Sequence, residues 1–310
     1  MIIRKAIDSD IPQIIELLRV SLGESLMPKS EALWRWKHQD NPFGASPVIL
    51  AELDGKLIGV RAFLHWEFWV DGAIQKACRA VDTAVHPDHQ GQGVFKKLTL
   101  SLVEAMEKEG IDLIYNTPNA DSLPGYLKMG WEKWGKLPLT LDFHLNSNKN
   151  KHSINPGSWE EIQVLVSKIE ADSTSYGQTY LKPGYLSWRY QNSPICPYHF
   201  LSNGSSYLLF YRIKEGKMGR ELRICDFFSL PEFPKKDQEA LNHELKKAAK
   251  LCGARFSSFA GIKAKKNSPL KLGSVPALKI GPLVTLRRLK PELNPMELDW
   301  NWSLGDLEVF

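Results

Sequence analysis

The stretch that decides the fold is "HPDHQGQGVFKKL", residues 86–98. It places Gly91 and Gly93 close together, after an apolar run typical of a strand and before one typical of a helix. One explanation is a tight turn, because glycine adopts backbone angles that other residues avoid. The other is a bound phosphate, because a glycine turn lets an anion approach the unpaired N–H groups of a helix start. The rest of the sequence has to decide between them.

The residues after the glycines predict a long amphipathic helix. Val94, Leu98, Leu102 and Met106 fall on one helical face, and Gly110 is a typical helix end. No Gly-Lys-Ser/Thr follows the glycines, as a P-loop would require, and the third glycine of the dinucleotide fingerprint is missing. These two phosphate-binding classes are therefore excluded, whereas another kind of anion site stays open.

Length and composition limit the class of protein. The chain has 310 residues, of which 43% are hydrophobic and 24% charged, so it can form one large or two ordinary globular domains. A net charge of +5 favours small anionic ligands, but no dense basic run indicates a nucleic-acid partner. No membrane-length apolar run or signal peptide is visible, and we expect no membrane partner. The four cysteines lack metal spacing, so we expect reduced thiols, a cytoplasmic location and no metal. The oligomeric state is not predicted.

The order of predicted elements indicates an α/β protein built twice. Residues 1–145 alternate strands and helices, and the polar stretch 146–157, "NSNKNKHSINPG", is typical of a linker. Residues 158–310 repeat the order, with a hairpin, a long helix ending in glycine and a further strand. "LWRWKHQDNP" at 33–42 resembles "LSWRYQNSP" at 186–194. A match this short can arise by chance, but the order of elements favours an internal duplication.

Two motifs in the first half resemble a known family. "AVHPDHQGQGV" is similar to the signature of the GNAT acetyltransferase superfamily, in which a strand is followed by Gln/Arg-x-x-Gly-x-Gly/Ala. Gln90 and Gly93 match its first and fourth positions, whereas the sixth is Phe95. A large side chain there could crowd a pyrophosphate. The second motif is Asn-x-x-Ala/Ser-x-x-x-Tyr-x-x-x-Gly-aromatic, which is common in the family. This chain matches it with Asn119, Ser122, Tyr126, Gly130 and Trp131.

The resemblance covers residues 1 to about 145 and implies the GNAT fold, a mixed and mostly antiparallel sheet flanked by helices. It also implies acetyl-CoA as co-substrate, with pantetheine along a splayed strand at 79–85 and the pyrophosphate on the glycine loop. The implied cofactor-binding residues are Thr83, Ala84, Val85, Gln90, Gly91, Gln92, Gly93, Val94, Phe95 and Asn119. Asn119 could instead order the short helix that follows it, and a mixed role is favoured.

The resemblance further implies direct attack of an amine on the thioester. Tyr126 matches the family's usual acid for the leaving thiolate, although a packing role is the alternative. The general base is not evident. Asp82 could serve, but strand alternation would turn it to the face opposite Arg79 unless a bulge intervenes. A water relay is equally open.

These features predict an acetyl-CoA-dependent N-acetyltransferase whose acceptor is a primary amine of a small molecule, with an amino sugar as one candidate. The alternatives are a transferase of another acyl or aminoacyl group and a non-catalytic binding module of GNAT shape. The second half, "PEFPKKDQEAL" included, has no phosphate loop. We expect it to be a degenerate GNAT-like copy that shapes the acceptor site. Trp188 and Arg189 are candidates for acceptor contacts, and a buried structural Trp-Arg pair is the alternative. A fragment ending near Asn150, if it stays soluble, is then expected to bind CoA and to lose acceptor turnover, and aggregation is the alternative outcome.

Overall fold

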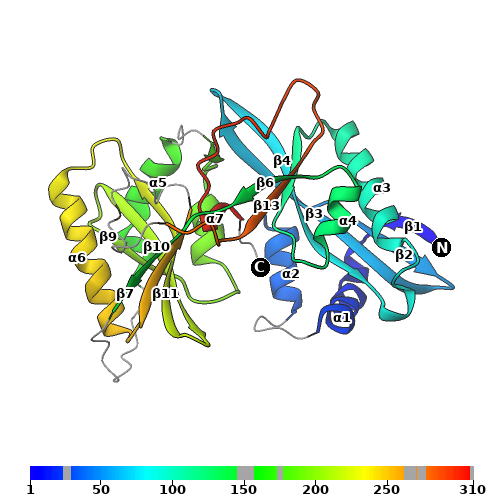
Figure 1. The fold of residues 1–310 in the computed structure, drawn as a ribbon, viewed down its shortest axis with the longest axis horizontal. Coiled ribbons are helices and arrows are strands. Elements are labelled where there is room, and N and C mark those ends of the chain that lie inside the picture. The colour runs from blue at the N-terminus through cyan, green and yellow to red at the C-terminus, as the bar shows by residue number, and fades with distance from the viewer. Residues whose placement is uncertain (24–28, 145–156, 173–176, 262–269, 271–276, 308–310) are drawn as a thin grey trace. The chain divides into compact units, whose positions relative to one another are not determined.

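The chain forms two compact units, which are described separately (Figure 1). The first comprises Met1–Gly135 with Leu283–Leu298, and the second Lys136–Pro282 with the residues from Asp299 onward. The computed structural model describes residues 1–23, 29–144, 157–172, 177–261, 270 and 277–307.

The first unit is built on a mixed sheet with the strand order β1-β2-β3-β4-β5-β13-β6. Strands β4 and β5 run parallel, whereas the pairs β1–β2, β2–β3, β3–β4 and β5–β13 are antiparallel. The Asp-Gly pairs at 54–55 and 71–72 have positive φ at both residues, as tight hairpin turns require. The strand bounds are β1 Ile2–Lys5, β2 Val48–Leu53, β3 Lys56–Val70, β4 Ala73–Val85, β5 Leu113–Asn116, β6 Glu132–Lys136 and β13 Leu283–Arg288.

Helices cover both faces of this sheet. Residues of α1 pack with Trp34 of α2 against one face, in a cluster that includes Val60 and Ala84. Residues of α3 and α4 pack against the other face, with Phe63, Cys78 and Ala80. Successive side chains of a strand alternate between faces, so the two clusters share strands but use alternate residues. The bounds are η1 Asp8–Asp10, α1 Ile11–Leu22, α2 Glu31–His38, η2 Pro87–His89, α3 Val94–Glu109 and α4 Leu123–Lys128.

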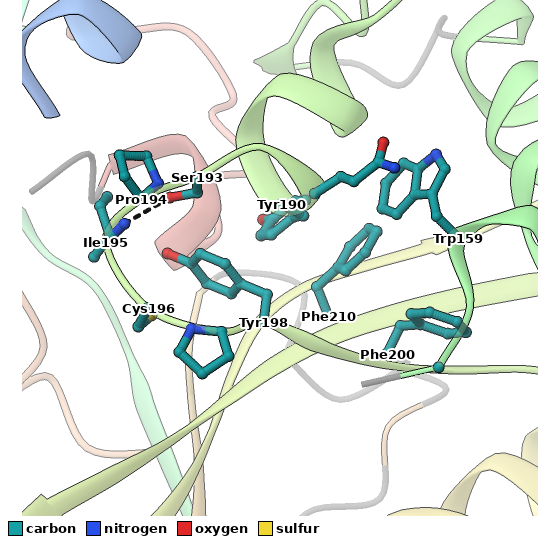
Figure 2. A pocket seen from close by; sticks show the side chains of 12 residues that line it. Trp159, Tyr190, Ser193, Pro194, Ile195, Cys196, Tyr198, Phe200 and Phe210 are labelled. Carbon is teal, nitrogen blue, oxygen red and sulfur yellow. Dashed lines mark hydrogen bonds between the residues drawn. The ribbon is translucent and has the colours of Figure 1, made fainter. Parts of the chain in front are cut away.

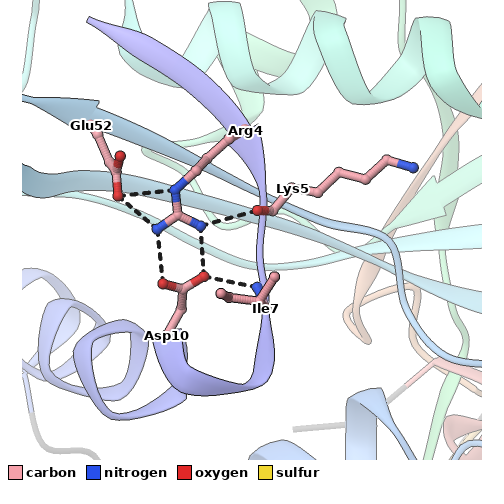
Figure 3. Close-up of polar contacts among 5 residues, drawn as sticks. All are labelled: Arg4, Lys5, Ile7, Asp10 and Glu52. Carbon is pink, nitrogen blue, oxygen red and sulfur yellow. Dashed lines mark hydrogen bonds and ion pairs between the residues drawn. The ribbon is translucent and has the colours of Figure 1, made fainter.

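A cluster of charges ties the start of the chain to the sheet (Figure 3). Arg4 of β1 donates to both carboxylate oxygens of Asp10, at 2.7 and 2.8 Å, and to Glu52 of β2 at 2.6 and 3.0 Å. Asp10 also accepts from the Ile7 N–H at 2.8 Å. The hydrogen bonds from Arg4 hold the pKa of Asp10 below its usual range.

The second unit has a five-stranded sheet in the order β7-β12-β11-β10-β9. Strands β11 and β12 run parallel and the other neighbours are antiparallel. Helix α6 packs on one face of the sheet over a core that includes Leu209, Leu222 and Leu245. The bounds are β7 Leu139–Phe143, η3 Trp159–Glu161, α5 Gln163–Ala171, β8 Gln178–Thr179, η4 (a π-helical turn) Ser187–Gln191, β9 His199–Ser202, β10 Tyr207–Gly216, β11 Gly219–Ser229, α6 Lys235–Leu251, β12 Phe256–Ala260 and α7 Leu304–Leu307.

The two units repeat one order of elements. Three antiparallel strands, β2-β3-β4 or β9-β10-β11, lead to a helix, α3 or α6, and then to a strand parallel to the third. In each unit the next strand in the sheet comes from the other half of the chain: β13 beside β5, and β7 beside β12. The predicted α/β class, with mixed and mostly antiparallel sheets flanked by helices, is confirmed.

Because β7 and β13 are exchanged, the two units do not have the boundaries expected from sequence, a first domain ending at 145 and a second beginning at 158. The first unit ends near residue 135, and β13 returns to it from the second half. The local sequence of β7 and β13 predicts strands, but nothing in it specifies which sheet they join, since pairing partners are set by the tertiary fold. The expected linker at 146–157 lies, apart from Gly157, outside the described residues.

Candidate active site

The glycine loop presents a row of main-chain donors. Gly91 and Gly93 have φ of +74° and +79°, and Gly93 caps the start of α3. A side chain at either glycine would be strained, although no atom lies within 4 Å of an added Cβ. Within the described part of the chain, no hydrogen bond uses the main-chain N–H groups of residues 91–96. This row lies at the positive end of the α3 dipole and is suited to an anion.

The Phe95 side chain is directed toward α4. Its ring meets that of Tyr126 edge-on, with centroids 5.6 Å apart, and a Cβ at Gly125 would come within 3.0 Å of it. Gly125 therefore makes room for the large residue at the sixth position of the loop motif. The ring packs against the core between α3 and α4.

Strand β4 separates from β5 halfway along its length. Its pairing with β5 runs only from Ala77 to Arg79, opposite Leu113 to Tyr115. The remaining residues, 80–85, stay paired with β3 on the other side. The described structure thus leaves the β5-facing edge of residues 80–84 without a strand partner, and an extended ligand could pair with it. At the end of this edge the Val85 carbonyl accepts from Gln90 Nε2 at 3.2 Å.

A β-bulge interrupts β4 at Asp82. Arg61 of β3 pairs with Thr83, and the next residue of β3 pairs with Val81, so Asp82 is the extra residue. Its φ of +40° is unusual for a residue other than glycine. Strand alternation resumes one residue out of phase, and Asp82 therefore lies on the α1–α2 face, on the same side as Arg79.

Two residues at the end of α2 hold the Asp82 carboxylate. Lys37 Nζ lies 2.9 Å and His38 Nε2 2.8 Å from its Oδ2, and both side chains are buried. Burial disfavours the charged carboxylate, but Lys37 and His38 outweigh it and hold the pKa of Asp82 well below its usual range. Burial also lowers the pKa of His38, which favours the neutral ring. Because an ionised carboxylate can only accept, the ring proton is on Nε2 and forms the hydrogen bond to Asp82. A carboxylate held in this way is a weak base.

Tyr126 of α4 contacts a buried arginine on the α3–α4 face of the sheet, the face opposite to that of Asp82. Arg61 Nη1 donates to the Tyr126 hydroxyl oxygen at 2.9 Å and also to the Thr83 hydroxyl. Arg61 is fully buried and Tyr126 is 5% exposed. Because the tyrosine oxygen accepts from Arg61, its own proton remains available to another acceptor. The sequence analysis did not identify Arg61, since an isolated arginine in a strand carries no motif.

Asn119 serves the start of α4. Its side-chain oxygen accepts from the Ser122 N–H and from the Ser122 hydroxyl, both at 2.8 Å. This contact orders the short helix that carries Tyr126, and Asn119 itself is exposed. Trp131, 2% exposed, packs edge-on against Tyr126 in the core.

The second unit repeats the contact at the bulge. Strand β11 also has a bulge, in which Cys225 is the extra residue and the next residue, Asp226, pairs with Phe210. Tyr190 donates to Asp226 Oδ2 at 2.8 Å, a contact like that of His38 with Asp82. The equivalent sequences are "WKHQDNP" at 36–42 and "WRYQNSP" at 188–194, which share Trp-x-x-Gln-x-x-Pro. Trp188 therefore corresponds to Trp36 rather than to Trp34, which is two residues earlier. The correct spacing was readable from the Gln and Pro that both segments contain.

In the second unit, the chain's own C-terminal segment occupies the region beside Asp226. The Ser303 hydroxyl donates to Asp226 Oδ1 at 2.5 Å, and a Cβ at Gly305 would collide with Asp226 and Tyr190. Trp188 and Arg189, which we expected to contact the acceptor, are 5% and 1% exposed. Arg189 Nη1 donates to the Tyr198 hydroxyl at 2.9 Å, and this hydrogen bond is buried.

The second unit also contains a pocket of about 530 Å³ with aromatic walls (Figure 2). Trp159, Tyr190, Tyr198, Phe200 and Phe210 supply these walls. Tyr190 stacks on Phe210 with ring centroids 3.9 Å apart, and its hydroxyl is already bonded to Asp226. These contacts place the pocket next to the repeated bulge and outside the glycine-loop region of the first unit.

Across the ranges that the structure describes, no group of three or more His, Cys, Asp and Glu side chains could hold a metal ion. Likewise, none of the described helices is long and apolar enough to span a membrane.

Comparisons with known proteins agree with this geometry. Residues 2–134 match the family model of the acetyltransferase (GNAT) domain. A GCN5-related N-acetyltransferase from Anabaena variabilis superimposes with a TM-score of 0.68 at 15% identity, covering 93% of this chain and 72% of that one. A probable N-acyltransferase from Enterococcus faecalis, described as a conserved protein of unknown function, gives 0.69 at 14%, with 93% and 73% covered. Eis1 from Mycobacterium abscessus gives 0.61 at 13%, with 93% and 74% covered. No protein of curated function matches the sequence.

The family match and the likeness of fold agree on the class of domain in the first unit. Residues 2–134 belong to the GNAT acetyltransferase domain family, and the likeness of fold to GNAT structures extends over 93% of the chain.

Proposed function

We propose that this protein transfers an acetyl group from acetyl-CoA to a primary amine of a small molecule, with an amino sugar as one candidate acceptor. The observation that carries the proposal is the pairing of two features in the first unit. A row of unpaired N–H groups at residues 91–96 lies at the end of β4, and β4 itself has a free edge at residues 80–84.

The loop and the strand would bind different parts of acetyl-CoA. The pyrophosphate would accept from the N–H groups of residues 91–96, at the start of α3. A shallow groove of about 330 Å³ adjoins this start and is lined by Lys96 and Lys97, whose charges favour a phosphate. The pantetheine amides would pair with β4 at Thr83, Ala84 and Val85.

Chemistry would proceed by direct attack of the amine. The nitrogen bonds to the thioester carbonyl carbon, the carbon–sulfur bond breaks, and its electron pair stays on sulfur. Tyr126 would protonate that sulfur, because Arg61 occupies the tyrosine oxygen and leaves its proton free. The amine proton would leave through water, since Asp82 is held by Lys37 and His38 and is a weak base.

The experiment is a panel of small amines incubated with acetyl-CoA, scored by amine-dependent release of free thiol and by the acetylated product in mass spectrometry. Gly93→Asp is expected to abolish the activity, because its carboxylate repels the phosphates and its Cβ blocks their approach. Gly110→Asp is the matched control, since Gly110 ends the same helix with a φ of +78°. Equal thiol release from wild type and a folded Gly93→Asp variant would refute the proposal.

Tyr126→Phe tests the acid. It retains the ring that packs against Trp131 and removes the proton donor, so CoA affinity should hold while kcat falls about 10²–10⁴-fold. Turnover equal to wild type would assign Tyr126 to packing alone.

A further inference from the structure

The buried guanidinium of Arg61 lacks a counter-charge. It is 0% exposed, and within the described part of the chain no carboxylate forms an ion pair with it. Its Nε and Nη2 atoms are buried and have no hydrogen-bond partner there, whereas Nη1 donates to two neutral hydroxyls. A buried, unpaired cation is costly for a folded protein, so such a group indicates an anion that arrives with a ligand.

The groups around Arg61 are neutral on every side that the structure describes. Phe63 of β3, Phe95 of α3 and Tyr126 of α4 have ring centroids 4.8, 5.8 and 5.4 Å from its guanidinium carbon. From β4 the facing group is the Thr83 hydroxyl. The nearby carboxylate of Asp82 points to the opposite face of the sheet, where Lys37 and His38 hold it.

Arg61 also lies at the place where β4 has its free edge. Its partner Thr83 belongs to the segment 80–85, which is not paired with β5. Its other partner, Tyr126, accepts from Arg61 and so keeps its own proton available for a further acceptor. An anion that reaches both the strand edge and the tyrosine would therefore be stabilised by the guanidinium.

We propose that Arg61 stabilises the negative charge that forms on the CoA sulfur during transfer. The inference rests on the proposed function. As the amine nitrogen bonds to the carbonyl carbon, the carbon–sulfur bond breaks and its electron pair moves to sulfur beside Arg61. Tyr126 then gives its proton to that sulfur, the phenolate oxygen keeps the hydrogen bond from Nη1, and water returns a proton to the tyrosine.

The direct test measures the ionisation of the CoA thiol on the protein. The probe is CoA, titrated with pH by its thiolate absorbance, with desulfo-CoA as the blank for tyrosine absorbance. A thiol that is free in water has a pKa of about 8.5, and a cation next to the sulfur favours the thiolate. We expect bound CoA to ionise at least about one pH unit lower on the wild type, and Arg61→Met to abolish this shift.

Arg79→Met is the matched control. Arg79 is also a nearly buried arginine of this sheet, but it lies on the other face, where it donates to Thr117 at 3.1 Å. Its removal should leave the thiol titration shifted as in wild type. Calorimetry with CoA separates the two proposals. No binding to wild type would overturn the proposed function, whereas tight binding with an unshifted thiol would overturn the role of Arg61 alone.

The stability of the ligand-free protein tests independently whether Arg61 serves a bound ligand or the fold. If Arg61 is retained for an incoming charge, Arg61→Met should unfold at the same or a higher urea concentration than wild type, because the substitution removes an unpaired buried cation. It should also lower kcat at saturating acetyl-CoA. A clearly lower urea midpoint, or failure to fold, would show that Arg61 supports the fold and would overturn the proposal.

Discussion

Asp82 adopts a backbone conformation that a residue other than glycine avoids, at a cost of about 1–3 kcal/mol. The contacts from Lys37 and His38 maintain it. The second unit has no glycine loop, yet it keeps an aspartate next to its bulge: Asp226 pairs with Phe210, does not have a positive φ, and accepts from Tyr190. We therefore infer that the aspartate holds the shape of the strand in both units, and in the first it positions the free edge of β4.

A double-mutant cycle tests this role. Asp82→Asn should lower the free energy of unfolding by about 3–5 kcal/mol, because it leaves the buried Lys37 ammonium without its partner. Lys37→Met/Asp82→Asn should recover most of that loss, since both charges are then absent. The measurement is urea unfolding at neutral pH. Additive losses in the double variant would contradict a coupled pair.

At the scale of single elements, the loop and helix were predictable and the bulge was not. Glycine spacing and the apolar face of residues 94–109 are local properties, and α3 begins and ends where they indicate. Asn119 and Tyr126 follow from a spacing motif. The bulge depends on the pairing of β3 with β4, which local sequence does not specify. The sequence therefore indicated only that a bulge, if present, would turn Asp82 to the same face as Arg79. Arg61 was missed because its interest comes from burial without a counter-charge, which local sequence does not reveal.

The junction of β1, β2 and α1 gives a prediction at this scale. Asp10→Asn should cost about 1–3 kcal/mol at neutral pH, because Arg4 loses a charged, two-pronged partner. The folded protein holds the pKa of Asp10 below its unfolded value, so this stabilisation is full above the unfolded pKa. It is lost as pH falls through the lowered folded pKa.

Urea unfolding of wild type and Asp10→Asn across acidic and neutral pH checks this sign. The gap between their free energies of unfolding should be widest at neutral pH and should narrow in acid. Asp8→Asn is the control, because Asp8 is exposed on the same turn. A gap that stays constant with pH would mean that the carboxylate charge does not contribute.

At the scale of the whole molecule, the exchange of β7 and β13 makes each unit depend on both halves of the chain. Residues Leu113–Asn116 of β5 pair with the returning strand β13, and Arg287 of β13 packs its guanidinium 5.2 Å from the Trp131 ring. A Cβ at Gly130 would also meet this arginine. Long-range pairing of this kind leaves no signal in local sequence, which explains why the sequence alone favoured an independent first half.

A fragment ending near Asn150 is therefore expected to misfold, in contrast to the expectation from sequence. It lacks β13 and exposes the edge of β5 and the face of Trp131. Residues 1–136 joined by a flexible linker to 283–298 should restore the sheet and fold cooperatively. Circular dichroism and thermal unfolding of the two proteins decide the matter. A cooperative transition in the shorter fragment would contradict the structural requirement for β13.

Titration calorimetry with acetyl-CoA tests the central claim most directly, because it counts sites as well as detecting them. The duplicated chain has one unit with a glycine loop before α3 and one in which Pro234 stands at the start of the corresponding helix, α6. We predict one molecule bound per chain, with binding lost in Gly93→Asp and retained in Gly110→Asp. No binding to the wild type, two sites per chain, or full affinity in a folded Gly93→Asp variant would contradict the account.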